Sequence, residues 1–507
     1  MLAWRLLCAV FTLVSVSSVY SDQRPQLVYG TYLGGRDKEC ASALAVDRSG
    51  AALVVGHTPS PDFPVTAGAF STTTRVNNDD WVGFVSRIGE RGDRLVYSTF
   101  LGGNFRSSAN AVAVDSAGRA FVAGSTCSSS FPTTPTAIQR TAPGSDKVEA
   151  CDGFVAWLSP DGSRAEYATY LGGKGEDSAT AIAVSPNGKV VYVAGYTSSS
   201  DFPVAGPALQ SKLSGTTNGF LSAIDVGSGR LLYSTYLGGT GNEQVTGIVA
   251  AGDGTVFVSG MTDSERWPSI RLASFGTLAR NDGFLLRIDP RGKAKPFGIR
   301  IGGANDDSIS GMSVDSHGDI YLVGSTNSPS FPVKGTYSNA VGSAFVVKID
   351  GRLFARGQAQ VLWSRRLGGH DEDALLSVSA DMEGSIFASG RSGSKDFPTT
   401  PNAFYQKLAV ENDSILVRLR TSDGKLEYAT FLGGTQQPNA AWYNDEATGV
   451  VATPDGDVFV TGCTLDARLP VTPGAFQTKP KGNSEPFVLR LKFPPLKPVP
   501  NGKPSRH

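Results

Sequence analysis

Short apolar runs recur along the chain in groups of four, separated by turns rich in glycine, proline and aspartate. One group occupies residues 180–184, 190–194, 220–224 and 231–237. Runs of this length that are rich in Val, Ile, Phe and Tyr predict β-strands and are too short for core helices. The first two runs are almost entirely apolar, as in strands buried on both faces, whereas the fourth also contains Ser and Thr, as in an edge strand. Each group therefore predicts a four-stranded sheet.

The fourth run of each group ends in two glycines, most often within the phrase TYLGG or TFLGG. The first of these glycines stands at positions 34, 102, 172, 238, 302, 368 and 433, so the repeat is 64 to 70 residues long. That period suits one four-stranded sheet with its loops. Seven such sheets around a common axis form a β-propeller, so we predict an all-β, seven-bladed propeller of four-stranded antiparallel blades. We expect the glycine pair to adopt positive φ where the chain bends towards the next blade.

The two ends of the repeat region complement each other. Residues 27–33 have the pattern of a fourth strand without the three that should precede it, and residues 487–491 have that of a third strand without a fourth. If the N-terminal strand completes the last blade, the ring closes without an open sheet edge. We therefore expect residues 26–492 to form a single propeller domain.

Two further motifs recur in most units. In the turn after the first strand, an aspartate is followed three positions later by a glycine, as at 47–50 and 115–118. This spacing predicts a hairpin in which the aspartate carboxylate accepts hydrogen bonds from local amides and the glycine adopts the left-handed backbone conformation. A bulky apolar residue precedes a proline after the second strand, and we expect it to pack between blades, the alternative being an aromatic ring that grips a glycan. These residues are Phe63, Phe131, Phe202, Trp267, Phe331, Phe397 and Leu469.

The N-terminus has the features of a secretory signal peptide, which we place at residues 1–21. Arg5 precedes an apolar run at 6–14, and small residues follow. The run is too short to span a membrane, and an uncleaved N-terminal anchor is the alternative. Residues 493–507 are rich in proline and lysine, which predicts an extended tail. We therefore expect a secreted, extracellular or cell-surface protein.

Charge and motifs narrow the function classes. Lys and Arg number 46 and so do Asp and Glu, so there is no electrostatic reason to expect a nucleic acid as partner, and no second apolar run is long enough for a membrane span. The sequence contains no HExxH, GxSxG or P-loop, and its four histidines accompany no recognisable nucleophile motif. Whether the protein is an enzyme stays open, with the absence of activity favoured.

The phrases YSTYLGG, AIAVDxxG, VYVAGxT and DFPTTP resemble the SBBP ("seven-bladed beta-propeller") repeat. The resemblance covers about residues 26–492, and the fifth and sixth units, which contain 297–303 and 363–369, match it least well. It implies a propeller fold and a secreted or cell-surface protein. It brings no established catalytic residues to this chain.

Four cysteines remain after the leader, and an even number in a secreted chain suggests disulfides. Cys127 and Cys151 border one loop of the same blade. Cys40 and Cys463 belong to the first and seventh blades, which are neighbours only if the ring closes. We predict the disulfides Cys127–Cys151 and Cys40–Cys463, with four unpaired thiols as the alternative.

In most units an acidic residue stands four positions after the second glycine of the pair. The seventh unit places it after a longer loop, and in the second unit Ser107 takes its place. We expect these residues near the mouth of the central channel. Local capping, in which each carboxylate accepts N–H bonds from its own crossover loop, is the favoured role because the feature repeats in nearly every blade. The alternative is a site for a cation such as Ca²⁺ or for another ligand. The candidates are Glu39, Asp177, Glu243, Asp307, Asp373 and Asp445.

We expect the protein to act as a binding or scaffolding module for an extracellular protein or glycan through its loop rim. Irregular loops at 67–80, 133–150 and 435–444 would set its specificity. One alternative is a lyase or hydrolase with a site at the acidic channel mouth, and another is a structural matrix or coat protein. Asn412 begins the single N-glycosylation sequon.

Overall fold

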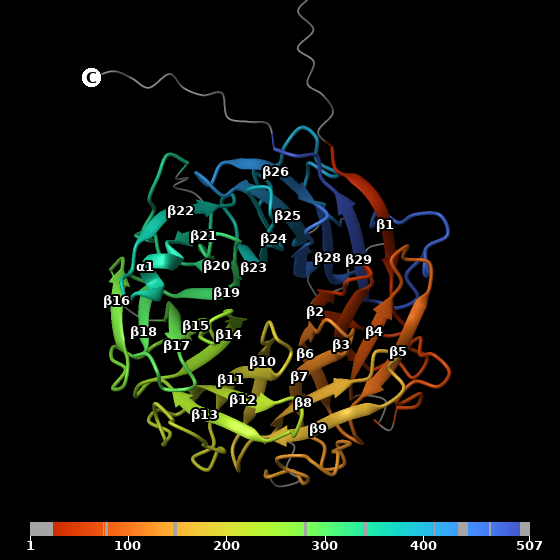
Figure 1. Ribbon diagram of the computed structural model, residues 1–507. Coiled ribbons are helices and arrows are strands. Elements are labelled where there is room, and N and C mark those ends of the chain that lie inside the picture. Colours follow the sequence, from red (N-terminus) through yellow and green to blue (C-terminus); the bar gives the residue numbers. More distant parts are fainter. Residues whose placement is uncertain are drawn as a thin grey trace, which may run out of the picture.

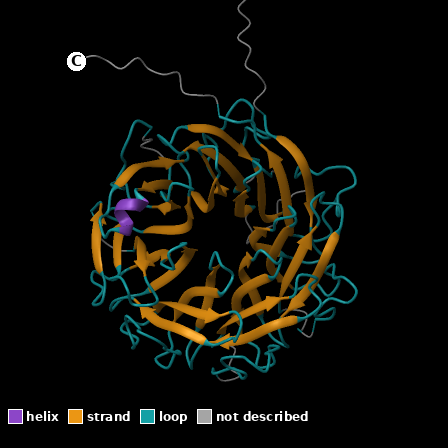
Figure 2. Cartoon of the chain, viewed as in Figure 1, coloured by secondary structure: helices purple, strands orange, loops and turns teal. Residues whose placement is uncertain are grey.

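Seven β-sheets stand side by side in a ring in the computed structural model of this protein (Figure 1). The structure describes residues 24–496 except 75, 77–79, 145–149, 278–280, 338–341, 410, 434–444 and 466–467. The signal peptide expected at 1–21 and most of the tail expected at 493–507 lie outside the described residues. Within them, the fold is the predicted all-β, seven-bladed propeller (Figure 2).

The blades are numbered in chain order, and their strands are given from the innermost outwards. Blade 1 contains β2 (Cys40–Val46), β3 (Ala52–Thr58), β4 (Val82–Ile88) and β5 (Leu95–Leu101). Blade 2 contains β6 (Ser107–Val114), β7 (Ala120–Thr126), β8 (Asp152–Leu158) and β9 (Ala165–Leu171). Blade 3 contains β10 (Asp177–Val184), β11 (Val190–Thr197), β12 (Asn218–Asp225) and β13 (Leu231–Leu237).

The remaining blades follow the same order. Blade 4 contains β14 (Glu243–Ala250), β15 (Val256–Thr262), β17 (Asp282–Ile288), β18 (Phe297–Ile301) and β16 (Arg271–Phe275). Blade 5 contains β19 (Asp307–Val314), β20 (Ile320–Thr326), β21 (Ala344–Ile349) and β22 (Val361–Leu367), with the short helix α1 (Gly351–Ala355) between the last two. Blade 6 contains β23 (Asp373–Ala380), β24 (Ser385–Ser392), β25 (Asp413–Arg420) and β26 (Leu426–Phe431). Blade 7 contains β27 (Glu446–Ala452), β28 (Asp457–Thr464), β29 (Glu485–Lys492) and β1 (Gln26–Tyr32).

The ring closes in blade 7, where the first strand of the chain lies beside the last (Figure 1). β1 and β29 are antiparallel, with Leu27 opposite Leu491 and Tyr32 opposite Phe487. β1 thus supplies the outer strand that the C-terminal segment lacks, and β29 does not present an open edge. The predicted closure is confirmed.

Blade 4 differs from the prediction because it has a fifth strand. β16 pairs in parallel with β18 along the outer edge of the sheet. In other blades the loop after the second strand touches the outer strand at isolated bridges, such as Ala205 with Ser234 and Tyr405 with Phe431. The exposed N–H and C=O groups of an edge strand favour such pairing, and in blade 4 the pairing extends over five residues.

The apolar core lies between neighbouring blades. One cluster joins Phe121 and Trp157 of blade 2 to Val193 and Phe220 of blade 3, all no more than 3% exposed. The residues before proline fill the same space, and six stack against the sheet of their own blade, as in the 4.5 Å centroid distance from Phe131 to Phe154. All seven are buried, so the packing role is confirmed.

The turns between the first two strands also match the prediction. The carboxylate of Asp115 accepts hydrogen bonds from the amides of Ala117 and Arg119, and Gly118 has a φ of 83°. The same turn recurs at Gly50, Gly318 and Gly384, which have φ angles of 79°, 86° and 89°. A side chain at these angles would be strained, which explains the repeated glycine.

Among the described residues, no helix is long and apolar enough to cross a membrane.

Candidate functional site

The six acidic residues predicted from the repeat lie at or directly before the start of the innermost strands. Asp177, Glu243, Asp307 and Asp373 are the first residues of β10, β14, β19 and β23, and Glu39 and Asp445 stand one residue before β2 and β27. All six are no more than 2% exposed. They are therefore buried beneath the crossover loops and do not line an open channel mouth.

Most of these carboxylates accept hydrogen bonds from their own crossover and from the end of the second strand. Asp177 Oδ2 accepts from the Gly173 amide at 2.7 Å and from Ser199 Oγ at 2.8 Å. Asp307 and Asp373 repeat both bonds with their equivalent glycine and serine, and Glu243 accepts from the Gly239 amide and from Thr262. These carboxylates therefore cap the loop that joins one blade to the next.

The glycines of the repeated pair are required because a side chain would not fit at these positions. The prediction that they adopt positive φ is wrong for most units. Among the described glycines of these pairs, Gly368 alone lies in the left-handed region, with a φ of 138°. A Cβ on Gly172 would lie 2.5 Å from Asp152 Oδ1 and 2.7 Å from Asp177 Oδ2, and a Cβ on Gly173 would lie 2.5 Å from Asp201 Oδ1. Glycine is needed because the buried carboxylates approach the backbone closely.

A second polar residue faces four of these carboxylates, Glu39, Asp177, Glu243 and Asp307, from the third strand of the preceding blade, and the sequence analysis missed it. Asp152 begins β8 and lies beside the crossover that leads to Asp177. Asp282 stands in the same relation to Asp307, and Glu485 to Glu39. The signal is a polar residue directly before the Gly-Phe or Pro-Phe that opens these apolar strands. It went unnoticed because the two residues of a pair belong to different repeats.

Several of these paired carboxylates have unusual proton affinity. Burial raises the pKa of Asp152 to about 7, and the charge of Asp177 adds to the shift. Burial also raises the pKa of Asp177 to about 6 and that of Glu39 to about 7. Asp152 Oδ1, Asp177 Oδ1 and Glu39 Oε2 are buried without a hydrogen-bond partner. A buried carboxylate pair holds two negative charges only if a proton or a cation compensates them.

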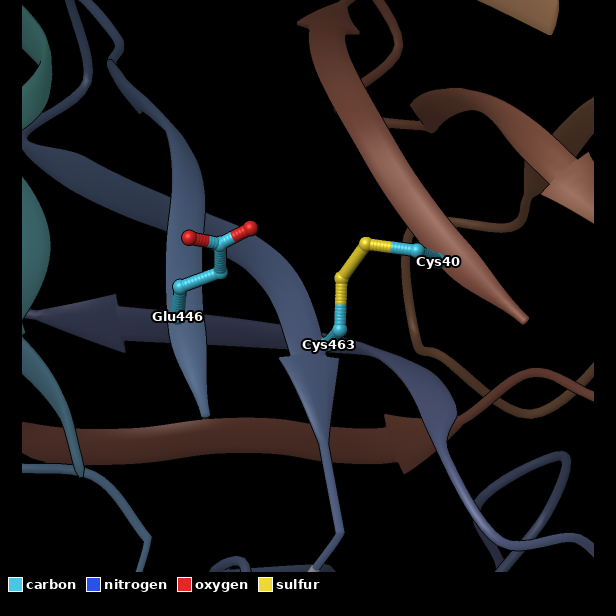
Figure 3. Close-up of side chains that lie close together, drawn as sticks. All are labelled: Cys40, Glu446 and Cys463. Atoms are coloured by element: carbon cyan, nitrogen blue, oxygen red, sulfur yellow. A yellow bond between two sulfur atoms is a disulfide. The ribbon is translucent and has the colours of Figure 1, made fainter. Parts of the chain in front are cut away.

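Both predicted disulfides are present. Cys127 and Cys151 close one loop of blade 2 with a Cα–Cα distance of 4.1 Å, and Cys40 and Cys463 join blade 1 to blade 7 with a Cα–Cα distance of 5.0 Å. Figure 3 shows Glu446 beside the second bond. Among the described residues, Cys40, Glu446 and Cys463 are the one group of three potential ligand residues within 4.8 Å of one another. Because the disulfide uses both sulfur atoms and Glu446 pairs with Arg391 at 3.2 Å, we assign no metal to this group.

Other predicted positions have simpler surroundings. Asn412 is half-buried directly before β25. The loop at 435–444 lies outside the described residues, whereas those at 67–80 and 133–150 are described in part. His57 is partly buried beside Trp81, and burial lowers its pKa, whereas His370 is exposed and pairs with Asp396.

These features define a class, the closed seven-bladed β-propeller. A family model described as "SBBP: Beta-propeller repeat" matches residues 166–203 and 297–332. The resemblance to the SBBP repeat inferred from the sequence is thus confirmed for these two regions. The second match includes part of the fifth unit, whose copy of the motif is among the weakest.

Comparisons with individual proteins add a distant relative. The chain is 23% identical over 278 residues to the "Regulatory protein FlaEY" of Caulobacter vibrioides, a match that covers 52% of this chain and 28% of that protein. The chain thus spans less than a third of the length of this relative.

Solved structures resemble the chain at low identity. One is U3-55K, which is 8% identical with a TM-score of 0.48, in a match that covers 92% of this chain and 99% of that one. A second is the Pan2 WD40 domain of Neurospora crassa, which is 8% identical with a TM-score of 0.45, in a match that covers 92% of this chain and 96% of that one. Another is the hydrazine synthase of Kuenenia stuttgartiensis (12%, 0.45, 84% and 92%). At these TM-scores the likenesses carry no argument about function.

Proposed function

We propose that the protein is a secreted or cell-surface propeller that binds an extracellular protein or glycan through the rim formed by its long loops. The observation that carries this proposal is the asymmetry of the loops. The loop after the second strand is long in every blade, as between β3, which ends at Thr58, and β4, which begins at Val82. On the opposite rim the connections are shorter, as between Val46 and Ala52, and even the one that contains α1, between Ile349 and Val361, is shorter than the loops after the second strands. Long loops on a rigid scaffold are the usual carriers of binding sites.

The surroundings of the acidic residues support binding over catalysis. A lyase or hydrolase at the channel mouth would need carboxylates that substrate can reach, whereas Asp177, Asp307 and Asp373 are no more than 2% exposed and bonded to their own loops. The balanced charge supports a protein or a neutral glycan as ligand and gives no support for nucleic acid.

A matched pair of charge reversals tests the rim. Lys212 is exposed in the loop between β11 and β12, and Lys189 is exposed in the turn between β10 and β11 on the opposite rim of the same blade. The mature protein is first tested on a glycan array and against proteins from the medium and cell surface of its host. We expect Lys212→Glu to weaken binding of the ligand so identified and Lys189→Glu to leave it unchanged. Absence of any ligand, or equal loss in both variants, would contradict the proposal.

Secretion is tested separately. N-terminal sequencing of protein recovered from the culture medium should show cleavage after residue 21. Protein retained inside the cell with residues 1–21 intact would refute the extracellular location.

A further inference from the structure

The crossover between blades 2 and 3 combines two buried carboxylates that lack a compensating group. Asp152 and Asp177 are 2% and 0% exposed. Asp152 Oδ1 and Asp177 Oδ2 lie 2.5 and 2.7 Å from the point that a Cβ on Gly172 would occupy, so the two oxygens face each other across this glycine. Asp152 Oδ1 accepts no hydrogen bond, and neither does Asp177 Oδ1. Asp152 Oδ1 therefore faces the Asp177 carboxylate in a buried position without a hydrogen bond, and a pair of this kind holds two negative charges only with a compensating proton or cation.

Three other junctions differ in the residue that faces the carboxylate, which is either an amide or a carboxylate with donors of its own, although Glu39 Oε2, Asp282 Oδ1 and Asp307 Oδ1 also accept no hydrogen bond. At the next crossover the partner is Asn218, whose side-chain amide donates to Glu243 Oε2 at 2.8 Å. Between blades 4 and 5 the partner Asp282 forms a buried ion pair with Arg300. At the closing seam the carboxylate of Glu485 accepts hydrogen bonds from the Gly482 amide, the Lys481 amide and the Gln477 side chain.

Among the residues that the structure describes, no such donor meets Asp152 Oδ1, and the charged side chains that act on Asp152 are the carboxylates of Asp177 and Asp201. The Gly144 amide is the hydrogen-bonding group that acts on the Asp152 carboxylate. Asp201, half-exposed above the junction, accepts a hydrogen bond from the Lys174 amide at 2.9 Å. The Lys174 ammonium is exposed and lies 3.9 Å from Asp201. Three carboxylates therefore surround Gly172 and Gly173, and the outermost one faces solvent.

We propose that Asp152 and Asp177 hold a divalent metal cation at the junction of blades 2 and 3. Hard cations bind carboxylate oxygens, and Ca²⁺ in particular accepts irregular sets of carboxylates, carbonyls and waters. The cation supplies the positive charge that Arg300 supplies between blades 4 and 5. It links the third strand of blade 2 to the first strand of blade 3 and so stabilises the contact between these blades.

The closest alternative is that the two carboxylates share a proton instead of a cation. The other blades show which substitutions distinguish a bound cation from a shared proton. Asp152→Asn reproduces the amide–carboxylate pair that Asn218 and Glu243 already form, so this variant should fold without a cation. Asn218→Asp creates at the next junction the pair proposed for the cation. Neither substitution changes the size of the side chain appreciably.

The experiment is calorimetric titration of the mature, EDTA-treated protein with Ca²⁺ and, in parallel, with Mg²⁺. We expect the number of bound cations per chain to fall by one in Asp152→Asn and to rise by one in Asn218→Asp. The melting temperature of the wild type should rise with the logarithm of the cation concentration, and this rise should be smaller in Asp152→Asn.

Equal stoichiometry in the wild type and Asp152→Asn, or no binding of either cation by the wild type, would overturn the proposal and leave the shared proton. If Asn218→Asp does not fold, the comparison of the wild type with Asp152→Asn still decides. The outcome is independent of whether the rim binds a protein or glycan.

Discussion

The covalent closure of the ring gives the largest stability effect that we predict. Cys40 lies in the innermost strand of blade 1 and Cys463 in the second strand of blade 7, so this disulfide joins positions 423 residues apart. Cys127–Cys151 spans 24 residues within one blade. In the chain-entropy description, a cross-link destabilises the unfolded chain more as the closed loop grows.

This difference can be expressed as free energy. The chain-entropy relation gives about 6 kcal/mol for the loss of Cys40–Cys463 and about 3.5 kcal/mol for the loss of Cys127–Cys151. The expected difference between the two double variants is therefore about 2.5 kcal/mol. The seam is also joined by hydrogen bonds between β1 and β29, so the ring without the disulfide should still fold.

The assay is equilibrium unfolding in urea of the wild type, Cys40→Ala with Cys463→Ala, and Cys127→Ala with Cys151→Ala. Peptide mapping of the non-reduced wild type establishes the connectivity beforehand. We expect the seam variant to have the lower free energy of unfolding of the two double variants, with a slope larger than that of the wild type because the unfolded chain expands without the cross-link. An equal or smaller loss in the seam variant would refute the reasoning, and so would a peptide in which Cys40 is joined to Cys127.

Three further predictions concern the crossovers and are measured by urea unfolding. Gly172→Ala should lower the free energy of unfolding by about 1–3 kcal/mol, because the added Cβ would collide with two buried carboxylates. The control Gly188→Ala, at a φ of 69° with no atom within 4 Å of the added Cβ, should lower it by about 1 kcal/mol through backbone strain alone. Equal losses in the two variants would contradict the crowding argument. Because the pKa of Asp152 is raised to about 7, its protonated form is favoured in the folded state. The cation-free wild type should therefore lose stability as the pH rises from about 4 to 7, and Asp152→Asn should lose less. Parallel plots of unfolding free energy against pH for the two proteins would refute this prediction. Arg300→Tyr leaves Asp282 buried without its cation and should cost about 3–5 kcal/mol, and adding Asp282→Asn should recover most of the loss; no recovery would show that the guanidinium acts by packing alone.

The repeat made the architecture predictable because each blade is encoded locally. The hairpin of Asp115 and Gly118 depends on residues three positions apart, and the same spacing recurs along the chain. The incomplete units at the two ends predicted that β1 would complete blade 7 and that Cys40 would meet Cys463. Burial of Phe131 and its equivalents followed from their apolar character.

The relations between blades were not predictable in the same way. Asp152 and Asp177 are 25 positions apart and belong to different blades, and no local pattern states that both side chains approach Gly172. The expectation of positive φ at the glycine pairs was wrong because the residues that crowd these glycines were unknown. Nor did the run at 271–275 indicate that it would pair in parallel with β18, because a strand's partner depends on which edge lies nearby after folding.

The sequence alone determined the number of blades, the order of the four repeated strands and the closing strand, because regular apolar spacing and tight turns act within a few residues, and it favoured the disulfide pairing that the structure has. Only the tertiary structure decided which carboxylates are buried together and which of them have a compensating donor. The physical reason is that solvation and electrostatic interactions depend on the distances between side chains of neighbouring blades, which the order of residues along the chain does not specify.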